Sequence, residues 1–371
     1  MADLLVYRAE GEAVVHGGDL YGFTVTEWRL PATYPPFAAV LFVPTTWIPV
    51  PALKVAFLAG NALLLARLVA LSARLAGRTA PLPLLCAATG LALWLEPVSQ
   101  TLLFGQVNLA IACLVLWDLT RPPGARAKGL ALGIAAGVKL TPAIFIAYLF
   151  LTARRKEAAT ATASFAGTAL SGALLLPSAT VDFWTRRVFE TGRVGKAWII
   201  DNQSLQGLIA RVAGTETPGL AWTLPATALA ATGLWLATRA RAPRSDRWGI
   251  LLTAFTALLA CPISWSHHWV WCVPLLAVLL AEGRMLLAAT TALVFTARTM
   301  WLVPHEGDRD LHLPWWQQPL ASPYPLLGLA LLAGAAVVLR RRGAALPARP
   351  GNPLPSARQP SARSSSASMM R

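Results

Sequence analysis

One lysine lies at the centre of the longest apolar stretch of the sequence, residues 129–151, and a proline follows it three positions later. At about 1.5 Å per residue, a helix over this stretch could cross a bilayer of roughly 30 Å once. Lys139 would cost about 2.5–3.5 kcal/mol on insertion, and Pro142 disfavours a continuous helix just before it. A kinked helix with the lysine paired to a buried acid would explain both features, although no acid lies nearby in the sequence. The alternative is a break in the helix that holds a cation where chemistry needs it.

A second group of polar residues is not explained by charge balance along the chain. Its members are Asp3, Tyr7, Arg8, Glu96, Gln106, Asn108, Asp201, Asn202, Gln203, His267 and His268. The two adjacent histidines would point about 100° apart on a helix, which is poor spacing for a metal. Trp265, Trp269 and Trp271 surround them, so anchoring at a membrane interface is as plausible as binding. No carboxylate cluster indicates a divalent cation, and we expect neither a metal nor another cofactor.

The composition predicts which elements must position these residues. Of 371 residues, 56% are hydrophobic and 13% are charged, with a mean hydropathy of +0.54. Such a chain with many separate apolar segments is an all-α polytopic membrane protein. A formal charge of +15 would suggest a nucleic-acid partner in a soluble protein, but here the arginines lie between apolar segments and in the tail. The four cysteines lie in apolar segments without zinc or redox spacing.

The apolar segments alternate with basic loops and with neutral or acidic ones. We expect segments in the membrane at about 53–73, 81–95, 108–120, 129–151, 158–177, 219–238, 249–263, 269–281, 285–303 and 323–339, and an interfacial helix at 36–48. The loops at 74–78, 121–128, 153–156, 239–247 and 340–342 are basic and should be cytoplasmic. The segments 1–35, 96–106 and 304–322, and the long polar loop 178–218, should then lie outside.

This assignment requires 129–151 to be re-entrant. Basic loops flank the segment on both sides, so a single crossing would give every later loop the wrong sign. Two half-crossings, with the turn at Lys139–Pro142 inside the protein, give every later loop the expected sign of charge. Irregular backbone is allowed at membrane depth where it lines a cavity. The unexplained polar residues then gather on the outer side, which favours an enzyme over a channel.

Seven short motifs carry a resemblance to a known family. In order they are Asp3-Leu-Leu-Val-Tyr7-Arg8, Gly17-Gly18-Asp19-Leu20-Tyr21, Thr33-Tyr34-Pro35-Pro36-Phe37, Gly105-Gln106-Val-Asn108, Gly137-Val-Lys139-Leu-Thr-Pro142, Asp201-Asn202-Gln203-Ser204-Leu205 and Pro262-Ile-Ser264-Trp265-Ser-His267-His268-Trp269. Together they resemble the polyprenol-phosphate-mannose-dependent α-(1→2)-mannosyltransferases of actinobacteria, glycosyltransferase family 87. The resemblance covers about residues 3–340. It implies a helical bundle of the GT-C fold, with extracytoplasmic loops and an extracytoplasmic active site in the plasma membrane.

The resemblance also implies the reaction and its partners. Mannose would pass, with inversion, from a polyprenyl-phosphate-mannose donor to a glycolipid or mannan acceptor, forming an α-1,2 linkage. One carboxylate suffices as the base, because the phosphodiester leaves as an anion and needs no general acid. We expect Asp3 to be this base, since GT-C enzymes place an acid in the first outer loop. Asp19 in Gly17-Gly18-Asp19 fits a turn better.

The same resemblance implies roles for the other residues. We expect Lys139 to bind the donor phosphate as a point charge, near a helix N-terminus. The remaining candidates form two groups: donor phosphate-binding His267, His268 and Arg8, and sugar- or acceptor-binding Tyr7, Tyr34, Glu96, Gln106, Asn108, Asp201, Asn202, Gln203 and Trp265. Their alternatives are loop capping and interface anchoring.

The resemblance has one departure and leaves two rivals. Family members usually carry a membrane helix before the motif at Asp3, and we expect 1–340 to form a GT-C domain that lacks it. Residues 341–371, rich in Pro, Ser, Ala and Arg, should be a disordered basic cytoplasmic tail. A flippase or transporter of a lipid-linked sugar would also use a broken helix with a lysine, but no internal repeat relates two halves. A GT-C enzyme for another polyprenyl-phosphate sugar, such as arabinose, is the second rival.

Overall fold

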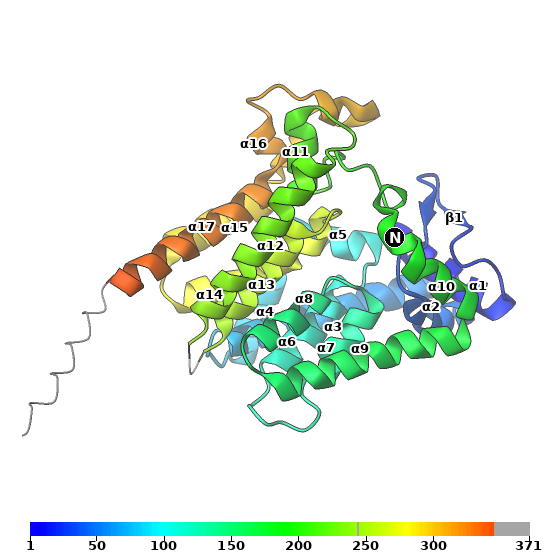
Figure 1. Cartoon of the computed structure of the whole chain (residues 1–371), viewed down its shortest axis with the longest axis horizontal. Coiled ribbons are helices and arrows are strands. Elements are labelled where there is room, and N and C mark those ends of the chain that lie inside the picture. Colours follow the sequence, from blue (N-terminus) through cyan, green and yellow to red (C-terminus); the bar gives the residue numbers. More distant parts are fainter. Residues whose placement is uncertain (243–244, 345–371) are drawn as a thin grey trace, which may run out of the picture.

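The computed structural model describes residues 1–242 and 245–344, and within them the chain is helical almost throughout (Figure 1). The two strands of this part, β1 (Thr24–Val25) and β2 (Leu30–Pro31), form one antiparallel hairpin. The predicted all-α class is confirmed. Most of the predicted tail, residues 341–371, lies outside the described residues.

Four helices are long and apolar enough to cross a membrane: α3 (Val50–Leu75), α9 (Arg155–Leu175), α12 (Leu220–Ala240) and the 323–341 portion of α17 (Pro323–Ala344). A fifth span would combine α4 (Leu82–Ala92) with α5 (Glu96–Phe104) across a bend of 79°. The bend falls where Pro97, in the first turn of α5, leaves Glu96 at the start of a new helix. The chain is therefore a multi-pass membrane protein, as predicted.

Several predicted spans are shorter helices in the structure. These are α6 (Asn108–Leu119), α7 (Leu130–Val138), α8 (Ala143–Leu151), α13 (Arg247–Ala260), α14 (Cys272–Ala281) and α15 (Met285–Thr296). Helices of 9–14 residues are 14–21 Å long at about 1.5 Å per residue, less than a bilayer core. The predicted interfacial segment 36–48 is helix α2 (Pro36–Phe42) followed by the 3₁₀ helix η1 (Val43–Trp47).

The remaining α-helices are α1 (Ala2–His16), α10 (Pro177–Thr185), α11 (Leu205–Ala213) and α16 (Gln318–Ala321). Helices α1, α2 and α10 and strand β1 gather at one end of the molecule, and α17 reaches the opposite end (Figure 1). A second small core of Leu20, Tyr21, Ala32, Ala39 and Phe183 packs these outer elements together.

Helix α7 packs closely along α9 through three glycines spaced four residues apart. A Cβ added to Gly129 would lie 3.0 Å from the Ala161 nitrogen. One added to Gly133 would lie 2.8 Å from the Phe165 nitrogen, and one added to Gly137 would lie 2.5 Å from the Thr168 Cβ. The contacts advance along both helices together, so α7 and α9 run in the same direction. Since α8 ends only four residues before α9 begins, the start of α7 and the end of α8 lie at the same end of α9.

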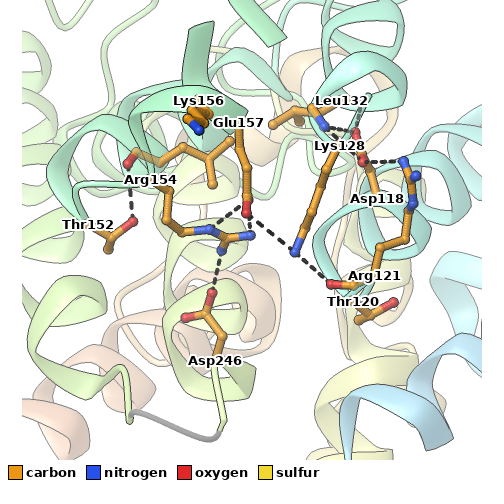
Figure 2. Close-up of polar contacts among 12 residues, drawn as sticks. Asp118, Thr120, Arg121, Lys128, Leu132, Thr152, Arg154, Lys156, Glu157 and Asp246 are labelled. Carbon is orange, nitrogen blue, oxygen red and sulfur yellow. Dashed lines mark hydrogen bonds and ion pairs between the residues drawn. The ribbon is translucent and has the colours of Figure 1, made fainter. Parts of the chain in front are cut away.

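A cluster of charges holds these ends together. We call Asp118, Lys128, Arg154, Glu157 and Asp246 the ion-pair cluster (Figure 2). Glu157 lies between Arg154 and Lys128, and it pairs with Lys128 at 3.6 Å. Arg154 reaches Asp246 on the N-terminal side of α13 at 2.8 Å. Asp118 accepts hydrogen bonds from the backbone nitrogens of Gly129, at 2.9 Å, and Leu132, at 3.0 Å, and so satisfies free donors at the start of α7.

Candidate active site

Lys139 lies in the break between α7 and α8. Its backbone is extended (φ −142°, ψ 127°), so α7 ends there, and Pro142 directly precedes α8. The ammonium donates to Asn108 Oδ1 at 2.9 Å and lies 2.9 Å from His268 Nε2. It also lies 5.5 Å above the ring of Tyr34. No carboxylate in the described ranges comes within 4.0 Å of it, so its partners are neutral groups and its charge is uncompensated at contact distance.

Asp3 stands in the first turn of α1, near Lys139 but without forming an ion pair with it. Its Oδ2 accepts a hydrogen bond from Gln106 Nε2 at 2.7 Å. Burial raises the pKa of this carboxyl to about 6, although the Gln106 bond and the positive charge of Lys139 both act to lower it. The negative charge of Asp201 raises it further. A carboxylate with such a pKa is a suitable base near neutral pH.

Two phenols and one amide pack behind Asp3. Tyr7, Tyr34 and Gln106 are all buried, with 1%, 8% and 5% of their surface exposed. Gln106 Oε1 accepts from the Tyr7 hydroxyl at 2.7 Å and from the Tyr34 hydroxyl at 3.1 Å. The family resemblance predicts that these three residues contact sugar, whereas in the structure their polar atoms bond to one another and to Asp3.

One of the two predicted histidines contacts Lys139 directly, and the other packs beside it. His268 contacts the ammonium, while His267 is buried between Phe104 and His268. The ring centroid of His267 lies 5.4 Å from that of Phe104 and 4.8 Å from that of His268. Both ring nitrogens of His267 lack a partner among the described residues. The backbone carbonyl of His267 accepts from Asn108 Nδ2 at 3.0 Å and from Thr101 Oγ1 at 3.1 Å. Asn108 therefore holds both Lys139 and the histidine segment. Nothing in the sequence marks Thr101.

A cavity opens beside the ammonium, among α6, α8, α13 and the segment before α14. Its polar lining includes Asn108, Lys139 and His268, and its apolar lining includes Phe145, Leu258 and Trp271. A cation at an apolar cavity suits a ligand with an anionic head and a hydrocarbon chain. The described residues contain no group of three or more His, Cys, Asp or Glu that could hold a metal ion.

Asp201 and Trp265 lie on two loops that pair beside this site. Asp201 Oδ1 accepts from the Ser266 nitrogen at 3.0 Å, and Asn202 forms a β-bridge with Trp265. Burial raises the pKa of Asp201. Both Asp201 and Trp265 remain partly exposed, so either could contact a ligand.

Four other predicted residues are engaged within the fold. Arg8, predicted to bind the donor phosphate, donates to the carbonyls of Thr45, Thr46 and Ile48 and pairs with Glu12 at 3.0 Å, so its guanidinium is engaged at the end of η1. Asn202 and Gln203 bond to backbone atoms of Ala197, Pro262, Ile200 and Ala321. Glu96, fully buried, accepts from Tyr324 at 2.7 Å and Trp301 at 3.1 Å.

Comparison with known proteins gives a consistent result. The chain is 31% identical to a polyprenol-phosphate-mannose-dependent alpha-(1-2)-phosphatidylinositol mannoside mannosyltransferase of Mycobacterium tuberculosis, over 92% of this chain and 85% of the relative. The protein of the same description from Mycolicibacterium smegmatis is 32% identical over 92% of this chain and 84% of its own length. A phosphatidylinositol pentamannoside mannosyltransferase of M. tuberculosis is 37% identical over 74% of this chain and 65% of the relative.

No solved structure matches the chain. The sequence profile described as Glycosyltransferase family 87 matches residues 32–264, a range that holds Lys139 and Asn108 as well as the loop at Asp201. The chain therefore belongs to glycosyltransferase family 87.

Proposed function

We propose that this membrane glycosyltransferase transfers mannose from polyprenyl-phosphate-mannose to a glycolipid acceptor such as a phosphatidylinositol mannoside, with inversion and formation of an α-1,2 linkage. The names of its relatives support both the donor and the acceptor class. The observation that carries the proposal is the nearness of Asp3 and Lys139 without an ion pair between them. An acid and a cation that lie near each other, each held by neutral groups, keep their charges available to a substrate.

In the proposed reaction, Asp3 takes the proton of the acceptor hydroxyl as the oxygen attacks the anomeric carbon of mannose. The new C–O bond forms as the bond from that carbon to the phosphate oxygen breaks. The electron pair of the broken bond goes to the polyprenyl phosphate, which leaves as an anion. Lys139 and His268 stabilise this developing negative charge. We place the first isoprene of the donor against the apolar wall of the cavity beside Lys139.

We assign the acceptor side to the partly exposed residues near Asp3. Asp201 can accept hydrogen bonds from sugar hydroxyls, and the indole of Trp265 can pack under a pyranose ring. His267 would line the phosphate side through its unpartnered ring. Arg8, Glu96, Asn202 and Gln203 hold the loops, as their internal hydrogen bonds indicate.

We further propose the GT-C fold for residues 1–340, with α7 and α8 as a re-entrant pair, an extracytoplasmic active site at the outer face of the membrane, and a cytoplasmic segment 341–371. The parallel packing of α7 on α9 supports the re-entrant pair, because it brings the start of α7 and the end of α8 to one end of α9. The ion pairs Lys128–Glu157 and Arg154–Glu157 join those two ends directly.

The activity is tested in membranes with labelled polyprenyl-phosphate-mannose and a short mannoside acceptor. Asp3→Ala should abolish transfer, while the protein remains folded and membrane-bound. Asp308→Asn, which changes an exposed carboxylate of the outer loops, is the matched control and should transfer normally. Full activity of the folded Asp3→Ala variant would disprove the assignment of the base.

The topology is tested by labelling a cysteine introduced at position 155 in a chain whose four native cysteines are changed to serine. Labelling only from the cytoplasm is expected, and a cysteine at position 216 should be labelled only from outside. Labelling of position 155 from outside would mean that 129–151 crosses the membrane once.

A further inference from the structure

The side chain of Gln106 joins the carboxylate of Asp3 to two buried phenols. Its Nε2 donates to Asp3 at 2.7 Å, while its Oε1 accepts from Tyr7 and Tyr34. The two hydroxyl oxygens also lie 3.1 Å from each other. All three side chains are at least nine-tenths buried, so water does not compete for these bonds.

The phenols determine which way the amide faces. Three contacts join the Tyr7 hydroxyl, the Tyr34 hydroxyl and Gln106 Oε1, but the two hydroxyls have only two protons. The two hydroxyls cannot donate to each other at the same time, so at least one of them needs the amide oxygen as its acceptor. A turned amide would leave that proton without a partner and would point its oxygen at the Asp3 carboxylate. The amide oxygen is thereby fixed toward the tyrosines, and the amide nitrogen must face Asp3.

The backbone before Gln106 brings the amide close to α1. Gly105 ends α5 in the left-handed conformation (φ 70°), and the Gln106 nitrogen bonds back to the Thr101 carbonyl at 2.9 Å. A Cβ at Gly105 would lie 3.0 Å from the Leu4 Cβ, so the glycine permits the close approach of α5 to α1.

We propose that Gln106 is a positioning residue, oriented by Tyr7 and Tyr34, that holds Asp3 in its carboxylate form with Oδ2 occupied and Oδ1 free to accept the proton of the acceptor hydroxyl. The inference rests on the proposed role of Asp3 as the base. An N–H donor stabilises the charged form of a carboxyl. Because the phenols prevent the amide from turning, its oxygen cannot accept a hydrogen bond from protonated Asp3, and the neutral form gains no equivalent stabilisation.

Other charges also face Asp3 and would remain in any variant of Gln106. The ammonium of Lys139 favours the carboxylate form, while Asp201 disfavours it. Tyr7 and Tyr34 stay neutral, because burial raises the pKa of each phenol. A change at Gln106 therefore removes one hydrogen-bond donor from Asp3 while the other charges that act on Asp3 stay the same.

The test is the pH dependence of kcat/KM for mannose transfer by the full-length chain in detergent or membranes. Wild type should lose activity as the pH falls through about 6, where Asp3 becomes protonated. Gln106→Met removes the donor at similar length, and its acid limb should move up by about one pH unit. The KM for the acceptor, measured above the limb, should stay unchanged.

Further variants test the role of the phenols and guard against misfolding of the first variant. Gln106→Glu keeps the shape and replaces the donor with an acid, so its limb should also move up. Tyr7→Phe and Tyr34→Phe each leave one hydroxyl for Oε1 and should keep the wild-type limb. The double variant removes both donors and should shift the limb in the same direction as Gln106→Met.

Two results would overturn the inference while leaving the proposed function in place. A wild-type acid limb in Gln106→Met with a raised acceptor KM would make Gln106 a sugar-binding residue, and a uniform loss at every pH would make it merely structural. In contrast, full transfer by Asp3→Asn would show that Asp3 is not the base. Failure of the proposed role of Asp3 is thereby distinguished from failure of the proposed role of Gln106.

Discussion

Two groups of partly or fully buried charges occupy different parts of the molecule and are held by different kinds of partner. In the ion-pair cluster, each acid has an opposite charge within 4.0 Å, as in Lys128–Glu157 at 3.6 Å and Arg154–Asp246 at 2.8 Å. Around Asp3 and Lys139, the partners are instead an amide from Gln106, an amide from Asn108 and the imidazole of His268. The acids of the first group have cationic partners, whereas the charges of the second group are held by neutral groups.

The difference separates structural from catalytic use of charge. A buried charge without an opposite partner is costly, so structural charges are found in pairs. The charges of Asp3 and Lys139 carry that cost, and in the proposed reaction they are available to a hydroxyl proton and a phosphate anion. Neutral hydrogen-bond partners can fix the position of a charge without cancelling it.

The largest expected effect comes from removing the acid of the second group. Asp3→Asn keeps the shape of the side chain but cannot accept the acceptor proton, and kcat/KM should fall by about 10³-fold. The folded state should not lose stability at neutral pH. Burial raises the Asp3 pKa above its unfolded value, so this group favours folding only at low pH, and that contribution is lost as the pH rises to about 6. Kinetics and a thermal unfolding curve for the same sample check both parts.

The cation of the second group comes next. Lys139→Met retains the length of the side chain and removes the charge beneath the proposed phosphate, so kcat/KM should fall by about 10²-fold. Thermal stability should be kept or improved, since an unpaired buried charge disappears. Competition by free polyprenyl phosphate should weaken in parallel. Unchanged inhibition by this product would place the phosphate elsewhere.

Much of this second group could be predicted from the sequence, because its residues violate local rules. Lys139 interrupts an apolar segment and Pro142 interrupts its helix, so both residues are conspicuous in the sequence itself. The family motifs then associate Asp3, Gln106 and Asn108 with the same site. The helical membrane class follows from composition, although several expected spans are shorter helices.

What the sequence could not predict is the pairing of residues distant along the chain. Arg8 caps carbonyls about 40 positions away, and Gln203 bonds to the carbonyl of Ala321. Polar residues of this kind look the same as ligand-binding residues until their partners are known. For this reason the sequence assigns the phenols behind Gln106 to sugar, and it shows the ion-pair cluster only as basic loops.

The ion-pair cluster should show the opposite response to loss of charge. Arg154→Met leaves Glu157 and Asp246 each without its closest cation, and breaking such part-buried pairs should destabilise the protein by about 3 kcal/mol. The kcat/KM per folded molecule should stay within about twofold, because the site at Asp3 is intact. Thermal unfolding and active-site-normalised kinetics measure the two effects. A large fall in kcat/KM without loss of stability would show that the two groups are not separate.

The smallest effect is expected where an ion pair is short but exposed. Lys196 and Asp308 lie 2.6 Å apart, closer than Arg154 and Asp246, yet about half of each side chain is exposed, at 52% and 49%. Water and salt screen such a pair, and holding two mobile side chains together offsets most of the attraction. Asp308→Asn should therefore leave both the melting temperature and kcat/KM unchanged within error, at low and at high ionic strength. If this variant destabilised the protein as much as Arg154→Met does, distance alone would explain the ion-pair cluster. If it does not, burial distinguishes the ion pairs that stabilise this fold from the exposed ion pairs that contribute little to its stability.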